Sequence, residues 1–298
     1  MNTIPYLPVE LTPAQAAAAI EQALLAGLDP EDCPARTAVP VPAGELLLMP
    51  AVGARYVGVK IAGVAPANPA RGLPRITGSY LLLDGPTLRP IALLDGVALT
   101  ALRTPAVTAV ALDRLATADA AHLVLFGAGP QAYGHLDALL GIRPLTRVTV
   151  VARRQGPAAE LVEYARALGL QATAGDPSAV READLVVCCT TSAEPLFEGA
   201  DVPDHAAVAA VGSHSPVGRE TDSTLVGRAA CYVEARAVAL REAGDLLIPL
   251  LEGRGPGPEN WTNLAELRTA PVSFDRPRLF KSVGMAWQDL AVAAALVG

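Results

Sequence analysis

The sequence predicts an α/β protein of two domains, one built on antiparallel or mixed strands and the other on a parallel sheet. The chain has 298 residues, and 51% of them are hydrophobic, which suits about two domains with sizeable cores. Between residues 44 and 94, short apolar runs are separated by turn residues, whereas later apolar runs alternate with helical patterns. Alternation of the second kind is typical of βαβ units, whose strands form a parallel sheet.

The first domain is expected to open with a helix in LTPAQAAAAIEQALLAG. Thr12 and Gln15 have the spacing of a capping box, Pro13 suits the first turn, and Gly27 can end the helix. The stretches GELLLMPA, RYVGVKIAGV and GSYLLLDGPTLRPIALLDG then predict strands, with a hairpin turn at residues 84–87. Strands joined by such short turns form an α+β unit with the first helix.

The second domain is expected to follow as strands and helices in alternation. A helix is predicted over LTALRTPAVTAVALDRLA, and AHLVLFGAGPQAYGHLDALLG then predicts a strand, a glycine-rich turn and a helix. RVTVVARR, ADLVVCCTTS and HAAVAAVGS predict further strands, and GPAAELVEYARALG predicts a helix between the first two of them. FKSVGMAWQDLAVAAALVG predicts the end of a strand followed by a C-terminal helix.

The composition excludes several classes of function. The net charge of -7 and the lack of a basic tract with aromatic residues argue against a nucleic-acid partner. No run of about 18 uncharged apolar residues exists, so we expect no membrane span. Arg36 is the first basic residue, so a signal peptide would lack its positive region. Four scattered cysteines (Cys33, Cys188, Cys189 and Cys231) predict a reduced, cytoplasmic protein without a metal site.

A glycine-rich turn carries the most specific motif in the chain. Gly127-Ala128-Gly129-Pro130-Gln131-Ala132 reads G-x-G-x-x-A, follows the apolar strand HLVLF and opens a helix. The first glycine allows a tight turn, the second lets a pyrophosphate approach the backbone, and the small third residue lets the helix pack on the strand. The helix N-terminus would then face the phosphates. We therefore predict a Rossmann domain that binds a dinucleotide; the alternative is a structural glycine turn.

The end of the next strand indicates which dinucleotide is bound. NAD-binding domains usually carry an acidic residue there, which holds the ribose 2′-hydroxyl. Here RVTVVARRQG offers Arg153 and Arg154 and no acidic residue. Guanidinium groups suit a 2′-phosphate, so NADP (as NADPH) is favoured over NAD. The alternative is that one or both arginines are simply solvated at the start of a helix.

Three basic residues outside the Rossmann part stand in apolar surroundings. The chain has 23 basic residues but only two lysines, and one of these, Lys60, lies in the apolar strand YVGVKIAGV. Burial would lower the pKa of Lys60 and enable proton exchange near neutrality; alternatively, the side chain reaches water from a strand edge. Arg36 and Arg103 also lie in apolar segments, and a desolvated arginine needs an anion such as a carboxylate, or else forms a structural ion pair.

Five stretches together closely resemble the ornithine cyclodeaminase/mu-crystallin family: GVKIAGVAPANPARGLP, ALLDGVALTALRTPAVTAVA, GAGPQAYGHLDAL, VGSHSPVGRE and FKSVGMAWQDLA. The resemblance runs in order from about residue 36 to residue 290. It implies a substrate-binding and dimerisation domain of residues 1–112 and 284–298, with a Rossmann NAD(P)-binding domain of residues 113–283 between them. It also implies a homodimer.

The resemblance further implies roles for particular residues. Arg36, Lys60 and Arg103 would surround the carboxylate of a substrate, with Lys60 as proton donor or acceptor. The cofactor would be lined by residues that could otherwise be ordinary loop or helix-start residues: Thr104, Thr190, Thr191, Ser282, Val283 and Gly284.

One position departs from part of the family. In its cyclodeaminase and alanine dehydrogenase members an aspartate precedes a small residue and a proline, and here GSHSP puts His214 at that place. Members that reduce cyclic ketimines lack this aspartate. A neutral His214 could take up part of the aspartate's proton chemistry, or it could be a loop histidine bonded to backbone. His122, His135 and His205 are expected to be structural.

These observations predict an NAD(P)H-dependent oxidoreductase that reduces a small, cyclic ketimine carboxylate to an amino acid. The enzymatic alternatives are an ornithine cyclodeaminase, which uses bound NAD+ and releases ammonia, and an amino-acid dehydrogenase. A further alternative is a non-catalytic NADPH-binding protein. The partner is expected to be a small imino or amino acid and not a nucleic acid or membrane.

Overall fold

The computed structural model describes residues 3–298, and the chain divides into two compact units. One unit runs up to Thr104 and takes up Met285–Gly298 as well, and the other is Pro105–Gly284. The chain first passes from one unit to the other inside helix α2 (Gly96–Leu115). The division of roles between the two predicted domains stays a prediction.

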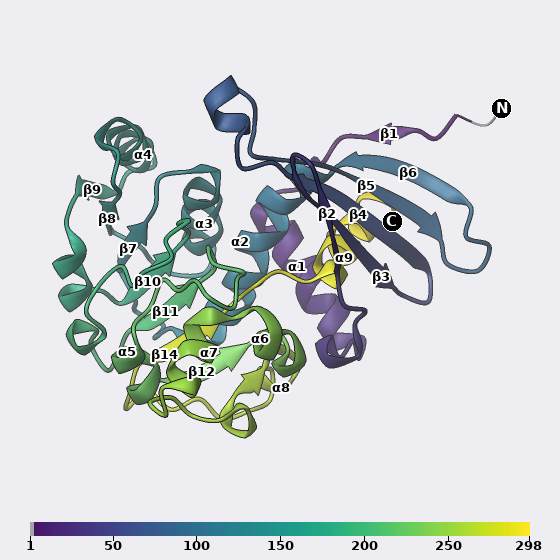
Figure 1. Cartoon of the computed structure of the whole chain (residues 1–298). Helices are drawn as coiled ribbons and strands as arrows, with labels where there is room; N and C mark the ends of the chain where they lie inside the picture. The colour runs from purple at the N-terminus through teal and green to yellow at the C-terminus, as the bar shows by residue number, and fades with distance from the viewer. Residues whose placement is uncertain (1–2) are drawn as a thin grey trace. The chain divides into compact units, whose positions relative to one another are not determined.

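The first unit contains a six-stranded sheet with the order β1-β6-β5-β4-β3-β2. Strands β2 to β6 are antiparallel to their neighbours, and β1 adds in parallel to β6. Helix α9 (Ala286–Val297) packs against β3, β4 and helix α1 (Pro13–Leu25) (Figure 1). The strands are β1 Tyr6–Leu7, β2 Thr37–Val41, β3 Gly44–Val52, β4 Tyr56–Val64, β5 Ile76–Asp84 and β6 Pro90–Asp95.

Strand β4 explains why Lys60 is buried. Side chains alternate between the two faces of a strand, and β4 places Gly58, Lys60 and Ala62 on the buried face but Ile61 on the exposed one. Lys60 pairs across the sheet with Met49 on one side and Tyr80 on the other. The strand is therefore internal to the sheet, and the alternative that Lys60 reaches water from a strand edge is wrong.

The local signals at the start of this unit are confirmed. Thr12 caps α1 and forms the capping box with Gln15, and Gly27 follows the helix with a φ of 92°. The predicted hairpin joins β5 to β6, and the Asp84 carboxylate accepts a hydrogen bond from the Thr87 amide. Strands β1 and β2 were not predicted, because β1 has two residues and every residue of β2 is exposed.

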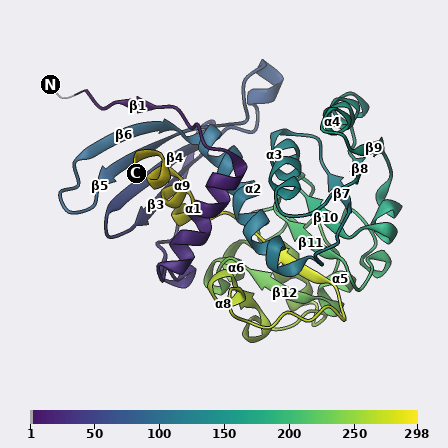
Figure 2. The same ribbon diagram turned by 180° about the vertical axis from the view of Figure 1, so that it is seen from behind.

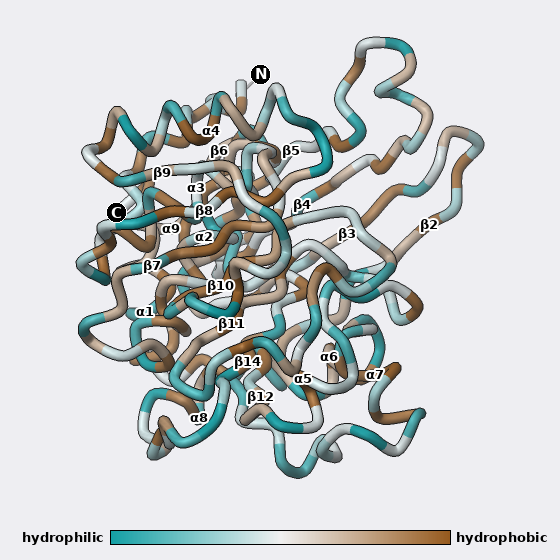
Figure 3. Tube along the Cα trace, turned by 90° about the vertical axis from the view of Figure 1, so that its left-hand side faces the viewer, coloured by the Kyte–Doolittle hydropathy of each residue, from teal (hydrophilic) through white to brown (hydrophobic). Residues whose placement is uncertain are grey.

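The second unit contains an eight-stranded sheet in which every pairing is parallel, with the order β13-β12-β14-β11-β10-β7-β8-β9. Its helices cover the sheet (Figure 2). Hydrophobic residues lie along strands such as β7, which is brown in Figure 3. The strands are β7 His122–Phe126, β8 Arg147–Val151, β9 Gln171–Ala174, β10 Leu185–Cys188, β11 Ala207–Ala210, β12 Ala230–Val233, β13 Thr262–Asn263 and β14 Arg278–Lys281.

The strand order identifies the topology. Strands β7, β8 and β9 follow one another on one side, and β10 and β11 follow on the other, which is the 3-2-1-4-5 part of the order of a doubly wound dinucleotide-binding sheet. The last strand of the chain, β14, takes the sixth place, and β12 and β13 lie beyond it. The direction reverses between β7 and β10, and ligands of such sheets bind at the carboxyl ends of the strands at this reversal. The predicted fold class, a Rossmann domain with an α+β domain, is confirmed.

The helices of this unit include several that were not predicted. Besides α2 they are α3 Pro130–Leu140, α4 Gln155–Ala167, α5 Ser223–Arg228, α6 Arg236–Glu242, α7 Gly244–Leu251 and α8 Leu264–Leu267. Helices α5 to α8 and strands β9, β12 and β13 escaped prediction because each is too short for a clear period. Across residues 3–298, no helix combines the length and the apolar character that a membrane crossing requires.

Candidate active site

Lys60 is held by residues from two helices of its own unit. Its ammonium donates to both carboxylate oxygens of Asp289 in α9, at 3.0 and 2.8 Å, and to the Thr100 hydroxyl in α2 at 3.1 Å. The Thr100 hydroxyl donates in turn to the Gly96 carbonyl at 2.7 Å, so it accepts from Lys60. Only an ammonium group has the three donors that these acceptors use, so this arrangement holds Lys60 in its protonated form.

The surroundings of Lys60 adjust its proton affinity. Burial lowers the pKa of Lys60 from 10.5 to about 8, because the charged form loses its hydration. Asp289 opposes this by favouring the ammonium, whereas the positive charges of Arg103 and Arg36 add to the lowering. A pKa of about 8 leaves the lysine protonated at neutral pH and close to its titration range. A role for Lys60 in proton transfer stays a prediction.

Arg103 shares the same carboxylate. Its Nη1 donates to Gln288 Oε1 at 2.9 Å, and its Nε lies 3.5 Å from Asp289 Oδ1. Lys60 is 3% exposed, Arg103 6% and Asp289 0%, so two buried cations face a single buried anion. This buried excess of positive charge favours a further anion, and an arginine fork matches the shape of a carboxylate.

Arg36 belongs to the same unit and lies just before β2, where it is partly exposed. Its charge acts on Lys60. Lys60 and Arg103 are thus brought together by one carboxylate, and the field of Arg36 reaches them. A role for the three residues in binding substrate stays a prediction.

Asp289, Gln288 and Thr100 are polar partners that the sequence analysis did not select. Gln288 and Asp289 are fully buried and adjacent in α9, a helix whose other residues are apolar: AWQDLAVAAALV. Two neighbouring polar residues in such a helix could have indicated a buried polar site. Their partners could not have been inferred, because Lys60 lies 229 residues away in the chain.

The glycine turn of the second unit has the geometry of a dinucleotide site. Gly127 has a φ of 110°, and a Cβ there would lie 2.8 Å from the Cys189 carbonyl oxygen, so this position needs glycine for the fold itself. Gly129 caps α3, yet among the described residues no heavy atom beyond Gly129 and its two chain neighbours lies within 4 Å of the position that its Cβ would take. Nothing in the fold requires a glycine there, whereas a pyrophosphate that approaches the backbone does.

The neighbouring residues of the fingerprint agree with this reading. Pro130 and Gln131 open α3, and Ala132 is fully buried, as packing of the helix on the strand requires. The predicted strand, turn and helix are all present. The reading as a purely structural turn does not explain Gly129.

Arg153 and Arg154 follow β8, the strand beside β7. Both are exposed, and Arg154 is the N-cap residue of α4. Neither forms an ion pair with another residue in the described part of the chain. No acidic residue stands at the end of β8, so two arginines remain available where an adenosine ribose is bound in this fold.

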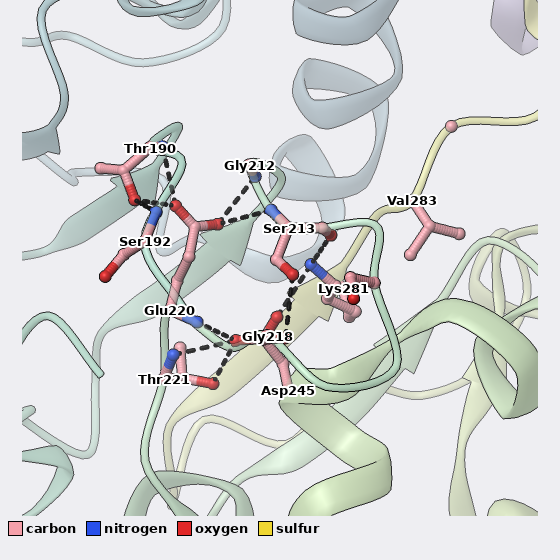
Figure 4. A network of polar contacts seen from close by, with 12 residues as sticks. Thr190, Ser192, Gly212, Ser213, Gly218, Glu220, Thr221, Asp245, Lys281 and Val283 are labelled. Carbon is pink, nitrogen blue, oxygen red and sulfur yellow. Dashed lines mark hydrogen bonds and ion pairs between the residues drawn. The ribbon is translucent and has the colours of Figure 1, made fainter. Parts of the chain in front are cut away.

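A buried carboxylate, Glu220, joins the loops that follow β10 and β11 (Figure 4). It accepts hydrogen bonds from the Thr190 amide, the Thr190 hydroxyl and the Gly212 amide, each at 2.7 Å, and from the Ser213 amide at 3.4 Å. Thr191, the next predicted cofactor residue, is exposed beside Thr190. Glu220 was not among the predicted site residues, although it ends the family motif VGSHSPVGRE.

A second buried carboxylate, Glu234, holds the loop after β14. It accepts from the Ser282 hydroxyl at 2.8 Å and from the Val283 and Gly284 amides at 2.9 Å each. The Ser282 hydroxyl therefore faces the protein interior. Thr104, the remaining predicted cofactor residue, is buried in α2 and is the last residue of the first unit before its helix enters the second.

The histidines differ in their surroundings. His214 is exposed in the loop after β11, in the second unit, whereas Lys60 is in the first. His122 lies between the Glu182 carbonyl and the Thr149 hydroxyl, His135 between the Gln131 carbonyl and the Thr108 hydroxyl, and His205 beside Asp184. The last three are therefore structural, as expected. Residues 3–298 contain no cluster of side chains able to hold a metal ion.

The doubly wound sheet, the open glycine turn and the reversal of strand order define a Rossmann dinucleotide-binding protein. Comparison with known proteins narrows this class. The sequence profile of the ornithine cyclodeaminase/mu-crystallin family matches residues 6–297. The chain belongs to this family, as its motifs predicted.

Named relatives come from several organisms. The chain is 32% identical over 259 residues to a Δ1-pyrroline-2-carboxylate reductase of Colwellia psychrerythraea, covering 84% of this chain and 82% of the relative. It is 35% identical over 263 residues to a Δ1-pyrroline-2-carboxylate/Δ1-piperideine-2-carboxylate reductase of Azospirillum brasilense, covering 87% and 82%. The solved structure of Thermococcus litoralis Δ1-pyrroline-2-carboxylate reductase, in complex with NADH and L-proline, has a TM-score of 0.90 and 28% identity, covering 96% of this chain and 92% of that one.

Proposed function

We propose that this protein is a nicotinamide-dependent reductase of small cyclic ketimine carboxylates, of the Δ1-pyrroline-2-carboxylate or Δ1-piperideine-2-carboxylate type. The observation that carries the proposal is the buried cluster of Lys60, Arg103 and Asp289, in which two cations share one carboxylate. A ketimine carboxylate supplies the missing anion and an imine nitrogen that must gain a proton. The named relatives reduce substrates of this kind.

Each residue of the cluster has a distinct task in this proposal. The nicotinamide, when bound, supplies the hydride to the imine carbon. Arg103 and Arg36 bind the substrate carboxylate and fix the orientation of the ring, which makes the reaction effectively unimolecular. Lys60 turns one of its three N–H groups from a protein acceptor, such as the Thr100 hydroxyl, to the imine nitrogen and gives up that proton. It is then reprotonated from solvent, which its pKa of about 8 permits at neutral pH. Asp289 keeps Lys60 charged and in place.

For the cofactor we infer a preference for NADPH over NADH. Arg153 and Arg154 support this preference, since they are exposed after β8 and no carboxylate competes for them among the described residues. The turn at Gly127 and Gly129 would hold the pyrophosphate. Thr190, Thr191 and the segment from Ser282 to Gly284 would line the nicotinamide half.

An assay with two reactions tests the function. Oxidation of NADPH in the presence of Δ1-pyrroline-2-carboxylate is the expected result, with L-proline as product. Release of ammonia from L-ornithine without net change of NAD+ would instead identify a cyclodeaminase. His214 stands where that reaction's aspartate is expected, which favours the reductase. A protein that binds NADPH but turns over neither substrate would be a binding protein.

We also infer a homodimer formed through the exposed face of the six-stranded sheet. Antiparallel sheets that face water usually carry polar residues there. Here the face carries Thr37, Thr77, Ser79 and Asp95, but a larger set of its residues is apolar: Tyr6, Val39, Leu46, Val52, Val57, Val59, Ile61 and Leu93. Val52 is 65% exposed and Ile61 44%. A second copy would cover this apolar face. Ile61→Glu should convert a dimer into monomers in analytical ultracentrifugation, and a wild-type monomer would contradict the inference.

We propose a cytoplasmic location on the basis of the cysteines. All four cysteines are free in the structure, and burial raises the pKa of the Cys188, Cys189 and Cys231 thiols. Such thiols are poorly reactive, and the chain contains no disulfide among its described residues. These features support a cytoplasmic protein.

A further inference from the structure

The loops that follow β10 and β11 are tied together unusually closely. A Cβ on Gly212 would lie 2.1 Å from the Thr190 carbonyl oxygen and 2.6 Å from a carboxylate oxygen of Glu220. The two loops therefore meet backbone to backbone, and Glu220 fills the space between them. Its oxygens face donors from both loops: the amide and hydroxyl of Thr190 and the amide of Gly212.

The backbone of Glu220 is itself held in place by Asp245 and, through it, by Lys281. Its amide donates to Asp245 Oδ1 at 2.7 Å, as does the Thr221 amide at 2.8 Å (Figure 4). The other oxygen of Asp245 forms an ion pair with Lys281 at 2.9 Å, and Lys281 also donates to the Ser213 carbonyl at 2.6 Å. Lys281 is the last residue of β14, so this network joins the carboxyl ends of β10, β11 and β14.

The position of this network in the sheet relates it to one half of a dinucleotide. The glycine turn after β7 lies at the reversal of strand order, and the arginines for the 2′-phosphate follow β8 on one side. A dinucleotide in this fold extends across the reversal, so its nicotinamide half lies over the ends of β10 and β11 on the other side. The loops held by Glu220 are on that side.

We propose that Glu220 is a positioning residue for the nicotinamide half of the cofactor. It acts through Thr190 and Gly212, whose loops it fixes, and it does not touch the cofactor itself. This inference rests on the proposed function in so far as that function requires a nicotinamide dinucleotide, and its test uses the proposed preference for NADPH. It predicts that a change at Glu220 weakens binding of the nicotinamide half and leaves the adenosine half unaffected.

The experiment compares two ligands on the full-length protein by isothermal titration calorimetry. NADPH contains both halves, whereas 2′,5′-ADP contains only the adenosine half with its 2′-phosphate. Glu220→Gln is nearly isosteric but directs an amide NH2 group at hydrogen-bond donors. We expect its Kd for NADPH to rise at least about tenfold, equal to about 1.4 kcal/mol, and its Kd for 2′,5′-ADP to stay within about twofold.

Asp184→Asn provides a matched control. The Asp184 carboxylate also accepts from two backbone amides, those of Ala121 and His122, at 2.8 and 2.9 Å. It lies just before β10, at the amino ends of the strands, whereas Glu220 lies at their carboxyl ends. Its loss should destabilise the unit without changing the Kd of either ligand. Glu220→Asp, which retains the charge on a shorter side chain, should fall between wild type and Glu220→Gln for NADPH, and provides the measurement if Glu220→Gln does not fold.

Four results would overturn the inference. An equal loss of affinity for both ligands would indicate a general structural role for Glu220, and so would the same split in Asp184→Asn. Unchanged binding of NADPH by both Glu220 variants would remove any role in positioning. A wild-type protein that binds 2′,5′-ADP but not NADPH would contradict the proposed function as well, so the two failures can be told apart.

Discussion

Removal of the Asp289 charge offers the sharpest test of how Lys60 works. Asp289→Asn keeps the size of the side chain but removes the anion that lies 2.8 Å from the Lys60 ammonium. With an effective dielectric constant of about 20, Coulomb's law gives an attraction of about 6 kcal/mol at this distance. Measured shifts from a neighbouring opposite charge are smaller, about 1 to 3 pKa units, and we use their middle value.

The expected result follows from the pKa of Lys60, which is about 8 in the wild type. Loss of Asp289 should lower this pKa by about 2 units. At pH 7 the protonated fraction of Lys60 then falls from about nine-tenths to about one-tenth. Reduction requires the protonated lysine, so kcat/KM at pH 7 should fall about tenfold.

The assay is the pH profile of kcat/KM for ketimine reduction between pH 5 and 10. In the wild type the rate should decline as pH rises through about 8, and in Asp289→Asn it should decline through about pH 6. Activity of the variant should approach that of the wild type near pH 5. Thermal unfolding must accompany the assay, since an unpaired buried charge costs about 3 to 5 kcal/mol. If the decline stays near pH 8 in the folded variant, Lys60 is not the group that titrates.

Three further predictions follow. Lys60→Arg keeps the positive charge but cannot release a proton, so kcat should fall at least about 100-fold; steady-state kinetics with normal kcat would exclude proton transfer by Lys60. The double variant Arg153→Ala with Arg154→Ala should raise KM for NADPH about tenfold and leave KM for NADH unchanged, and equal changes in both would exclude the 2′-phosphate role. Burial lowers the pKa of His135 from 6.5 to about 4, so the unfolded chain gains the proton first as pH falls, and stability is lost between about pH 6.5 and 4. The free energy of unfolding, measured with urea, should fall between pH 7 and pH 4 in both proteins, and in His135→Gln this fall should be about 3 kcal/mol smaller than in the wild type. An equal fall in both proteins would contradict the role of His135 in the loss of stability.

The features that could be predicted from the sequence are those that depend on residues close together in the chain. The capping box of Thr12 and the turn at Gly127 depend on residues within a few positions of each other, and both are present as expected. Burial of Lys60 in its apolar strand was one of two alternatives, the other being a side chain that reaches water from a strand edge. The adjacent Val59 and Ile61 lie on the other face of the sheet, so their apolar character could not decide between the two; the internal position of the strand does.

The remaining features depend on contacts between distant segments. Asp289 meets Lys60 across 229 residues of chain, and Glu234 meets Gly284 across 50. No local pattern distinguishes such a carboxylate from one on the surface. Glu220 was within a recognised stretch, but its burial follows from the close approach of Thr190 and Gly212, which only the folded backbone shows.

The origin of Asp289 in α9 has a consequence for the order of events during synthesis. The sheet that contains Lys60 leaves the ribosome early, but α9 emerges only after the whole second unit. Until then Lys60 and Arg103 have no carboxylate, and burial of two unpaired cations is strongly unfavourable. The first unit therefore cannot close its core around these residues while translation is in progress.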